Sequence, residues 1–297
     1  MTARTVTVPD GTRLYVDEIG DGDLTLLVPA ACWLERDLDR LAANDVRIVF
    51  YDQRNRGRSD RSGAETILFA QEAEDLETVR QSLGDAPVVT LGWSYLGAVV
   101  ALHARRYPRS VRGVIMVAPM APRDPDEGHY EIDDEVRQGF AERWRTYGPR
   151  IEQVEARLAI GPVSLALRRE HQRLNSAARM AAAGAIDRMR SEPWRYENEW
   201  PEHRDATFAA LFGGLADRDW RQGMGVITTP VLIVHGESDG PIAMSRDWAD
   251  ALPDAQLIGL PGVGHFPWLE EPDVFDEAVK AFLARVKRLG DDRVGER

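Results

Sequence analysis

The stretch Val88–Gly97, which reads VVTLGWSYLG, decides how the rest of the chain is interpreted. Its first half is apolar and rich in β-branched residues, which is typical of a buried strand in a parallel sheet. After Gly92 the pattern changes to Ala, Leu and Val at helical spacing, and Pro108 ends this helical pattern. Ser94 is therefore expected at a tight turn that joins a strand to a helix.

A serine at such a turn has two interpretations. In the first it is a nucleophile, because the turn exposes its hydroxyl at the carboxyl end of the sheet, beside helix N–H groups that attract negative charge. In the second, Ser94 only caps the helix that follows. The motif is Gly-x-Ser-x-x-Gly, with Leu96 where the nucleophile motif usually has glycine and Gly97 one place later. Features elsewhere in the chain separate the two interpretations.

Strand-like apolar segments alternate with amphipathic helical segments on both sides of this turn. This alternation predicts an α/β fold with a mostly parallel central sheet and helices on both faces. Besides the strand that precedes Ser94, strands are expected at 5–8, 13–19, 24–28, 46–51, 111–118, 230–236 and 255–260. Besides the helix that follows Ser94, helices are expected at 34–43, 65–83, 243–251 and 273–289.

The alternation stops between about Met120 and Met224. This part of the chain has no strong strand signal, and a helix break is expected at the pair Gly148-Pro149. Its helical segments are expected at 133–147, 150–159, 163–177 and 207–215. We therefore expect residues 1–119 and 225–297 to form one α/β core, and residues 120–224 to form an inserted helical cap over the carboxyl edge of the sheet.

Composition narrows the classes of function. The chain has 297 residues and a formal net charge of −12, with acidic residues scattered along it, so no nucleic-acid partner is expected. The six histidines are also scattered, so neither a metal nor another cofactor is expected. Composition leaves the oligomeric state open.

Cysteine usage and the apolar segments bear on the compartment. Cys32 is the single cysteine, so no internal disulfide can form and a reducing compartment fits. The first residues lack the apolar core of a signal peptide, and no stretch approaches the roughly 18 apolar residues of a membrane span. We therefore expect a cytoplasmic protein without a membrane partner.

Four segments, taken together and in their order along the chain, resemble the α/β-hydrolase fold family with a helical cap, in particular its proline-iminopeptidase-like branch. They are the stretch 51–59 (YDQRNRGRS), the turn at Ser94, the segment 235–239 (HGESD) and the segment 264–266 (GHF). The first is similar to the family pattern D-x-R-G-x-G-x-S, with Asn55 where glycine is usual. The order serine, acid, histidine is the one this fold uses. The resemblance covers about residues 5–289.

The resemblance implies that Ser94, Asp239 and His265 form a catalytic set. A serine hydroxyl is a weak nucleophile until a base takes its proton. His265 is the implied base, and Asp239 would fix its tautomer and stabilise the imidazolium. Glu237 is a rival for the acid because it lies two residues away, and a loop histidine that caps a turn is the alternative for His265. His235 ends a buried strand and is expected to be a core residue.

Acyl transfer also needs two backbone donors for the tetrahedral intermediate. The N–H of Tyr95, the residue after the implied nucleophile, is one of them. The other is expected in the loop after the strand 24–28, where relatives usually carry His-Gly and this chain has Pro29-Ala30. Because proline has no N–H, Ala31 is the expected donor and Cys32 is the alternative.

Four further residues are candidates for contact with the substrate. Trp33 and Trp93 flank the region of the two backbone donors and are expected to line the pocket. Glu197 and Glu199 lie in an aromatic part of the cap, where they could hold a substrate amine. The alternative for the two glutamates is a solvated face of the cap.

These features predict a cofactor-free serine hydrolase that cleaves an ester, amide or related acyl bond of a small molecule through an acyl-enzyme on Ser94. Iminopeptidases proper carry a glycine-rich loop after the strand that corresponds to 24–28, and this chain lacks it, which favours an esterase over an aminopeptidase. A C–C hydrolase or lyase on the same fold is one alternative, and a non-catalytic ligand receptor is another.

Overall fold

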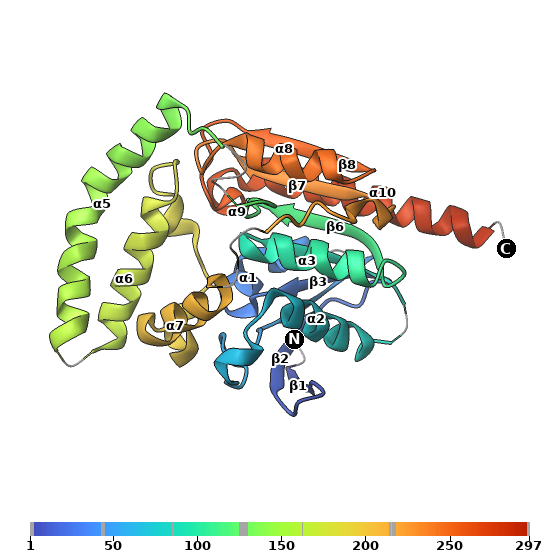
Figure 1. Ribbon diagram of the computed structural model, residues 1–297, viewed down its shortest axis with the longest axis horizontal. Helices are drawn as coiled ribbons and strands as arrows, with labels where there is room; N and C mark the ends of the chain where they lie inside the picture. Colours follow the sequence, from blue (N-terminus) through green and yellow to red (C-terminus); the bar gives the residue numbers. More distant parts are fainter. Residues whose placement is uncertain are drawn as a thin grey trace.

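An eight-stranded sheet forms the centre of the computed structural model, in the order β1-β2-β4-β3-β5-β6-β7-β8 (Figure 1). Strand β2 is antiparallel to both of its neighbours, and all pairs from β4 to β8 are parallel. The strands are β1 (Arg4–Thr7), β2 (Arg13–Ile19), β3 (Leu24–Pro29), β4 (Val46–Tyr51), β5 (Val88–Trp93), β6 (Val111–Val117), β7 (Val231–Gly236) and β8 (Ala255–Leu260). The α/β fold class predicted from the sequence is confirmed.

The structure describes most of the chain. The described residues are 3–42, 45–84, 86–124, 130–161, 163–213, 215 and 218–295, and the side chains of 291–295 are not described. The segment expected as a cap, 120–224, therefore includes residues 125–129, 162, 214, 216 and 217, which lie outside the described part.

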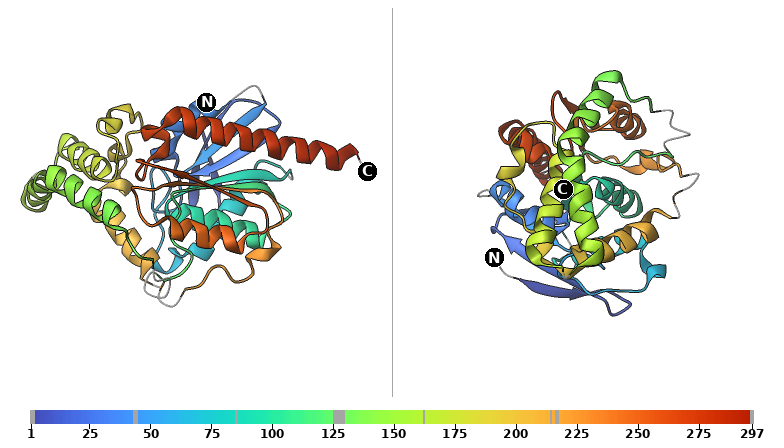
Figure 2. Two further views of the ribbon diagram at one scale, coloured as in Figure 1. Left: turned by 90° about the horizontal axis from the view of Figure 1, so that it is seen from above. Right: turned by 90° about the vertical axis from the view of Figure 1, so that its left-hand side faces the viewer.

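Helices cover both faces of the sheet, which explains why β3 and β7 are buried at every position. One face carries α1 (Ala31–Leu38), α9 (Pro267–Glu270) and α10 (Pro272–Gly295), and the other carries α2 (Phe69–Gln81), α3 (Tyr95–Arg106) and α8 (Ile242–Ala251) (Figure 2). Short 3-10 turns η1 (Asp39–Leu41), η2 (Ala64–Thr66) and η6 (Met224–Val226) lie in the connections. The central helix α3 is almost wholly buried between the sheet and its neighbours.

Between β6 and β7 the chain leaves the sheet and forms a group of helices, and we call residues 120–224 the helical insertion. Its main helices are α5 (Asp134–Ile160), α6 (Leu165–Ala178) and α7 (Pro201–Phe212), with 3-10 turns η3 (Ala185–Arg188), η4 (Pro193–Arg195) and η5 (Glu197–Glu199). Helices α5 and α6 pack side by side at the left of Figure 1, and α7 lies between this pair and the sheet.

The helix break expected at Gly148-Pro149 is wrong, because α5 runs through Pro149 as one helix of 27 residues. Proline lacks a backbone N–H and normally clashes with the Cβ atom of the preceding residue. Gly148 has no Cβ, and an atom placed there would lie 2.6 Å from the Trp144 ring. The glycine therefore removes the clash with Pro149 and lets Trp144 pack over the helix at this point.

Candidate active site

Ser94 occupies the sharp turn between β5 and α3. Its φ of 59° lies in the left-handed region, which residues other than glycine adopt only where the surrounding structure enforces it. The Ser94 N–H donates to the carbonyl of Val117 at 2.9 Å, and its own carbonyl accepts from the N–H of Met120 at 3.1 Å. Two hydrogen bonds to β6 and the residues after it thus hold the turn in its strained conformation.

Two glycines make this turn possible. A Cβ atom on Gly92 would lie 2.1 Å from the carbonyl oxygen of Leu96, so only glycine fits before the turn. A Cβ atom on Gly97 would lie 2.8 Å from the side chain of Pro119. The second close approach therefore falls at Gly97 rather than at Leu96, which explains the unusual Gly-x-Ser-x-x-Gly spacing.

His265 and Asp239 come together from the loops that follow β8 and β7. The Nδ1 atom of His265 lies 2.6 Å from Oδ2 of Asp239, and the imidazole is buried. Its other nitrogen, Nε2, is buried without a hydrogen-bond partner among the described residues. His265 and Ser94 line the same cavity, and a buried nitrogen without a partner on a lining residue calls for a functional explanation.

The rival acid has a different environment. A Cβ atom on Gly259 of β8 would lie 2.3 Å from Oε1 of Glu237, so this carboxylate packs against the edge strand. His235 is also engaged elsewhere, since its Nε2 atom lies 3.0 Å from the carbonyl of Gly240 and its Nδ1 atom 2.9 Å from Ser245 Oγ. Of the two acids considered, Asp239 is the one in contact with His265.

The electrostatics of the pair suit a base at neutral pH. Burial lowers the pKa of His265 below its ordinary 6.5, against the opposing charge of Asp239. Burial alone would raise the pKa of Asp239, but the interaction with His265 and the charge of Arg179 outweigh it and bring that pKa below its ordinary 3.8. The Arg179 guanidinium lies 3.6 Å from the second carboxylate oxygen of Asp239. A neutral imidazole beside an ionised carboxylate is therefore the favoured state.

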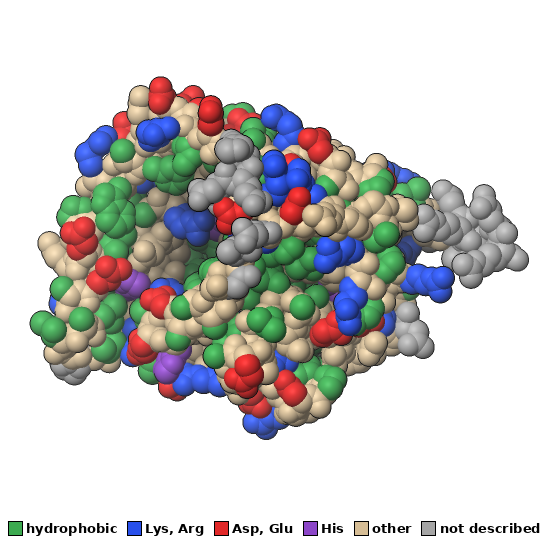
Figure 3. Space-filling view, in the orientation of Figure 1, with side chains coloured by type: hydrophobic (Ala, Val, Ile, Leu, Met, Phe, Trp, Pro, Cys, Tyr) green, Lys and Arg blue, Asp and Glu red, His purple; other side chains and the backbone are tan. Residues whose placement is uncertain are grey.

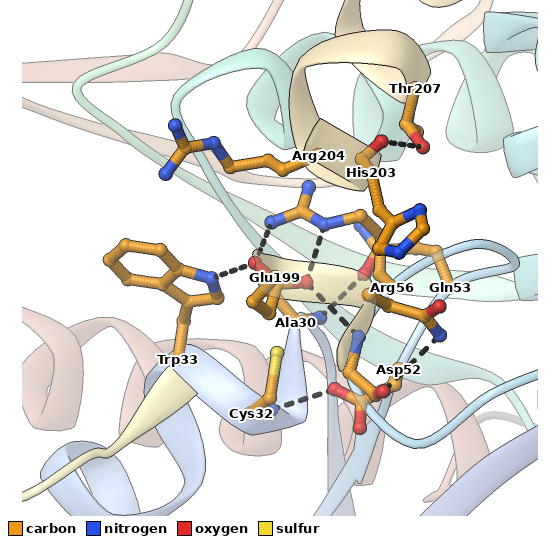
Figure 4. Close-up of polar contacts among 12 residues, drawn as sticks. Ala30, Cys32, Trp33, Asp52, Gln53, Arg56, Glu199, His203, Arg204 and Thr207 are labelled. Carbon is orange, nitrogen blue, oxygen red and sulfur yellow. Dashed lines mark hydrogen bonds and ion pairs between the residues drawn. The ribbon is translucent and has the colours of Figure 1, made fainter. Parts of the chain in front are cut away.

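Two helices begin near the cavity: α3 at Tyr95, which lines it, and α1 at Ala31, which follows the lining residue Ala30. The first N–H of α3 belongs to Tyr95 and the first of α1 to Ala31, and initial N–H groups have no partner inside their own helix. The neighbours of Ala31 are engaged, because the Ala30 N–H donates to Gln53 Oε1 at 3.1 Å and the Cys32 N–H to Asp52 Oδ1 at 2.7 Å (Figure 4). Ala31 and Cys32 were the two candidates for the second oxyanion donor. The Cys32 N–H is already hydrogen-bonded to Asp52.

The segment 51–59 holds the start of α1 in place. Asn55 has a φ of 60°, a conformation that glycine and asparagine tolerate best, so asparagine is compatible with the position at which the family pattern has glycine. A Cβ atom on Gly57 would lie 2.3 Å from the carboxylate of Asp52. The tight turn thus brings Asp52 to the start of α1, where its carboxylate accepts a hydrogen bond from the N–H of Cys32, next to Ala31.

The cavity beside Ser94 has a volume of about 520 Å³ and lies between the sheet and the helical insertion. Figure 3 shows hydrophobic side chains in the hollow between the α5–α6 pair and the rest of the molecule. Trp33 and Trp93 line the cavity, as expected from the sequence. The insertion also contributes lining residues that were not expected from the sequence, which are aromatic (Phe140, Trp144, Phe208) and polar (Gln172, Asn175, Ser176, Arg179, Arg204, Asp205). Two of these residues could have been found from their spacing in α7. Arg204 and Phe208 are four positions apart, so they lie one turn apart on the same face of the helix.

The side chain of Glu199 has a structural role. Its carboxylate accepts two hydrogen bonds from the Arg56 guanidinium, at 2.7 and 2.9 Å, one from Trp33 Nε1 at 2.6 Å and one from the Gly57 N–H at 3.0 Å (Figure 4). The side chain has no exposed surface. Burial would raise the pKa of Glu199, but the charge of Arg56 outweighs it and lowers that pKa. Glu199 therefore joins the helical insertion to the core.

Glu197 points to a different surface. Its side chain is 59% exposed, forms an ion pair with Arg61 at 3.2 Å and lies 3.4 Å from the His203 imidazole. Neither Glu197 nor Glu199 lines the cavity that contains Ser94. The structure therefore does not support the expectation that these carboxylates hold a substrate amine.

In the described ranges, no group of three His, Cys, Asp or Glu side chains is arranged to hold a metal ion. None of the helices in that same part of the chain combines the length and the apolar run that a membrane crossing requires.

Comparison with known proteins agrees with the geometry. The family model described as alpha/beta hydrolase fold matches residues 30–272. The chain is 27% identical over 305 residues to the polyketide synthase ThaQ of Burkholderia thailandensis, covering 98% of this chain but only 13% of that protein. It is 25% identical over 284 residues to the pimeloyl-[acyl-carrier protein] methyl ester esterase of Yersinia enterocolitica, covering 91% of this chain and 97% of that protein.

A solved structure supports the same fold. The crystal structure of proline iminopeptidase from Mycobacterium smegmatis superposes with a TM-score of 0.72 at 18% identity, covering 97% of this chain and 100% of that one. The family resemblance expected from the sequence is confirmed. The protein is an enzyme of the hydrolase type, and the chain belongs to the alpha/beta hydrolase fold family.

Proposed function

We propose that the protein is a serine hydrolase that cleaves a carboxylic ester through an acyl-enzyme on Ser94. The observation that carries the proposal is the shared cavity of Ser94 and His265, with Asp239 at 2.6 Å from the far side of the imidazole. Nucleophile, base and orienting acid are the three roles that this chemistry requires. The esterase among the relatives supports the choice of bond.

In the first half of the reaction, His265 Nε2 takes the proton of the Ser94 hydroxyl as its oxygen attacks the ester carbonyl carbon. The negative charge that develops on the carbonyl oxygen is stabilised by the N–H groups of Tyr95 and Ala31. Collapse of the tetrahedral intermediate breaks the bond to the alcohol oxygen, which receives the proton from His265. Asp239 stabilises the imidazolium during this step and keeps Nε2 facing Ser94.

In the second half, the same groups act on water. His265 takes a proton from a water molecule whose oxygen attacks the acyl carbon, and the same two N–H groups stabilise the second oxyanion. The bond to Ser94 then breaks, the proton returns to the Ser94 oxygen, and the carboxylic acid leaves. The balance of atoms is that of ester hydrolysis, and no cofactor takes part.

We also infer that the helical insertion acts as a cap that sets substrate choice. Its helices supply much of the cavity wall, so the substrate would be enclosed between them and the sheet. The aromatic lining favours an apolar acyl or alcohol group. The charged side chains of the lining are three arginines and one aspartate, which favours a neutral or acidic substrate over a free amine.

The experiment is covalent labelling combined with ester turnover. A fluorophosphonate should modify wild-type protein at Ser94, located by peptide mass spectrometry, and should abolish hydrolysis of an aryl ester. The Ser94→Ala variant should be unlabelled and inactive, while Ser59→Ala, which removes a buried serine outside the cavity, should still be labelled. Folded wild-type protein that neither reacts with the probe nor hydrolyses any ester would favour a ligand receptor.

A further inference from the structure

The carboxylate of Glu270, the last residue of α9, joins the helical insertion to the loop that carries His265. It accepts hydrogen bonds from the N–H groups of the two residues that flank His265, at 2.9 and 3.2 Å. It also accepts from the N–H groups of Ala181 and Ala182, in the insertion, at 2.7 and 3.0 Å. One side chain therefore binds both segments at once.

This carboxylate depends on its four N–H donors. Glu270 is 3% exposed, and the hydrogen-bond donors that reach its carboxylate from the described residues are four backbone N–H groups, with the charge of Arg143 acting on it as well. A buried carboxylate is stable only where hydrogen bonds replace the water it has lost. The insertion and the histidine loop (residues 261–266) thus cannot separate here without leaving a buried charge short of donors.

A direct contact reinforces the link. The N–H of His265 itself donates to the carbonyl of Arg179 at 3.0 Å. The neighbouring Gly264 lies so close that a Cβ atom on it would be 2.3 Å from the same carbonyl oxygen. Three consecutive N–H groups, at 264, 265 and 266, are therefore bound either by Arg179 of the insertion or by Glu270.

The insertion is fixed to α9 and to the acid loop as well. The guanidinium of Arg188 donates to the carbonyls of Leu269 and Glu270 at 2.7 and 3.1 Å. The guanidinium of Arg143 donates to the carbonyl of Ser238, next to Asp239, at 3.0 Å. These contacts hold α9 and the loop of the proposed acid against two parts of the insertion, η3 and α5.

We propose that Glu270 is a positioning residue, through which segment 179–182 of the helical insertion sets the place of His265 relative to Ser94 and Asp239. Glu270 is not among the residues that line the cavity, so it acts through the histidine loop and not on the substrate. The proposal rests on the proposed function, in which His265 is the base. It gives the insertion a part in assembling the catalytic groups, beyond enclosing the substrate.

The main test is Glu270→Gln, which keeps the size of the side chain. A carboxamide has one acceptor oxygen, so at least one of the four N–H groups would face its NH₂ group instead. We expect kcat for an aryl ester to fall by roughly 10- to 100-fold through misplacement of His265, with KM nearly unchanged because the cavity lining is intact. The matched control is Glu271→Gln, at the exposed neighbouring residue, which should behave as wild type.

A spectroscopic reading separates positioning from stability. The proton between His265 Nδ1 and Asp239 should give a far-downfield proton NMR resonance, because the two heavy atoms are 2.6 Å apart. In folded Glu270→Gln this resonance should shift or broaden, and in Glu271→Gln it should not. Glu270→Asp keeps the charge but shortens the side chain by one methylene group. It should therefore also lower kcat and shift or broaden the resonance.

Three results would overturn the proposal. They are wild-type kcat in Glu270→Gln, a fall in kcat with an unchanged resonance, and failure of both Glu270 variants to fold, which would make Glu270 a residue of stability alone. Ser94→Ala is measured in parallel to separate the two proposals. An active Ser94→Ala would refute the serine mechanism, whereas an inactive Ser94→Ala beside a fully active Glu270→Gln would refute only the role of Glu270.

Discussion

The indole Nε1 of Trp93 donates a hydrogen bond to the main-chain carbonyl of His265 at 2.9 Å. The two rings also pack, with their centroids 5.1 Å apart. Trp93, the residue before the proposed nucleophile, thus holds His265, the proposed base, in place. This contact gives Trp93 a part in the geometry of the site beyond lining the cavity.

Trp93→Phe should therefore weaken both the fold and the reaction. The substitution keeps an aromatic ring but leaves the His265 carbonyl without its donor, which costs about 1–3 kcal/mol for a buried acceptor. We expect a lower free energy of unfolding in urea and a lower kcat. Trp144→Phe is the control for stability, because that indole is half exposed. Equal effects of the two substitutions would contradict the prediction.

The pH dependence of kcat/KM follows from the burial of His265. The imidazole must be neutral to accept the Ser94 proton, and burial disfavours its charged form and lowers its pKa below 6.5. Activity should thus be lost as the pH falls through that lowered pKa, and the midpoint of the acid limb should lie below pH 6.5. An aryl ester assayed from about pH 4 to 9 gives the profile. A midpoint above 6.5 would mean that another group controls the acid limb.

The choice of acid can be checked by comparing two variants in which a carboxylate is replaced by an amide, Asp239→Asn and Glu237→Gln. Asp239→Asn should leave the imidazole without its charged partner and lower kcat by roughly 10⁴-fold, the size of this effect in other serine hydrolases. Glu237→Gln should have little effect, because that carboxylate packs against Gly259 of the edge strand. The reverse ranking would identify Glu237 as the acid.

The parts of the structure that the sequence predicted are those that local patterns specify. The strand before Ser94 and the helix after it follow from apolar spacing, and Gly92 marks the tight turn between them. The order of Ser94, Asp239 and His265 along the chain allowed the pairing of the last two to be anticipated. Their contact at 2.6 Å is an outcome of the sheet bringing three loops to one edge.

Contacts between distant segments could not be predicted in this way. Glu199 looks like one of several acidic residues near the surface, yet it meets Arg56, which lies 143 positions earlier. Neither local sequence predicts that the two residues form an ion pair. The passage of α5 through Pro149 likewise depends on the missing Cβ of Gly148, a detail that outweighs the usual meaning of a proline.

Glu199→Gln tests the structural role of that pair. Removing one charge leaves the Arg56 guanidinium buried without compensation, which costs about 3–5 kcal/mol. Because the folded state lowers the pKa of Glu199, the stabilisation is present above its ordinary 4.5 and is lost as the pH falls through the lowered value. Urea denaturation at two pH values should show that the difference between wild type and variant is large at neutral pH and smaller in acid. An unchanged free energy of unfolding at neutral pH would contradict the buried ion pair.

The charge of the preferred substrate distinguishes an esterase from an aminopeptidase. An aminopeptidase needs an anionic group that faces the substrate amine, and Glu197 and Glu199 both lie outside the cavity. The charged lining instead includes the guanidinium of Arg204, which is 15% exposed and bonded to Gln172 and Asp205. We expect a neutral aryl ester to be hydrolysed faster than a proline arylamide of similar size.

The N-acetyl form of the arylamide completes the comparison, because acetylation removes the positive charge while keeping the scissile bond. If no carboxylate binds the amine, acetylation should not lower kcat/KM. Glu197→Gln should leave the ratio of ester to amide turnover unchanged, since this side chain is paired with Arg61 and lies beside His203 at the surface. A strong requirement for the free amine would instead point to Asp205, the one carboxylate among the lining residues that the structure describes, and Asp205→Asn would then abolish that preference.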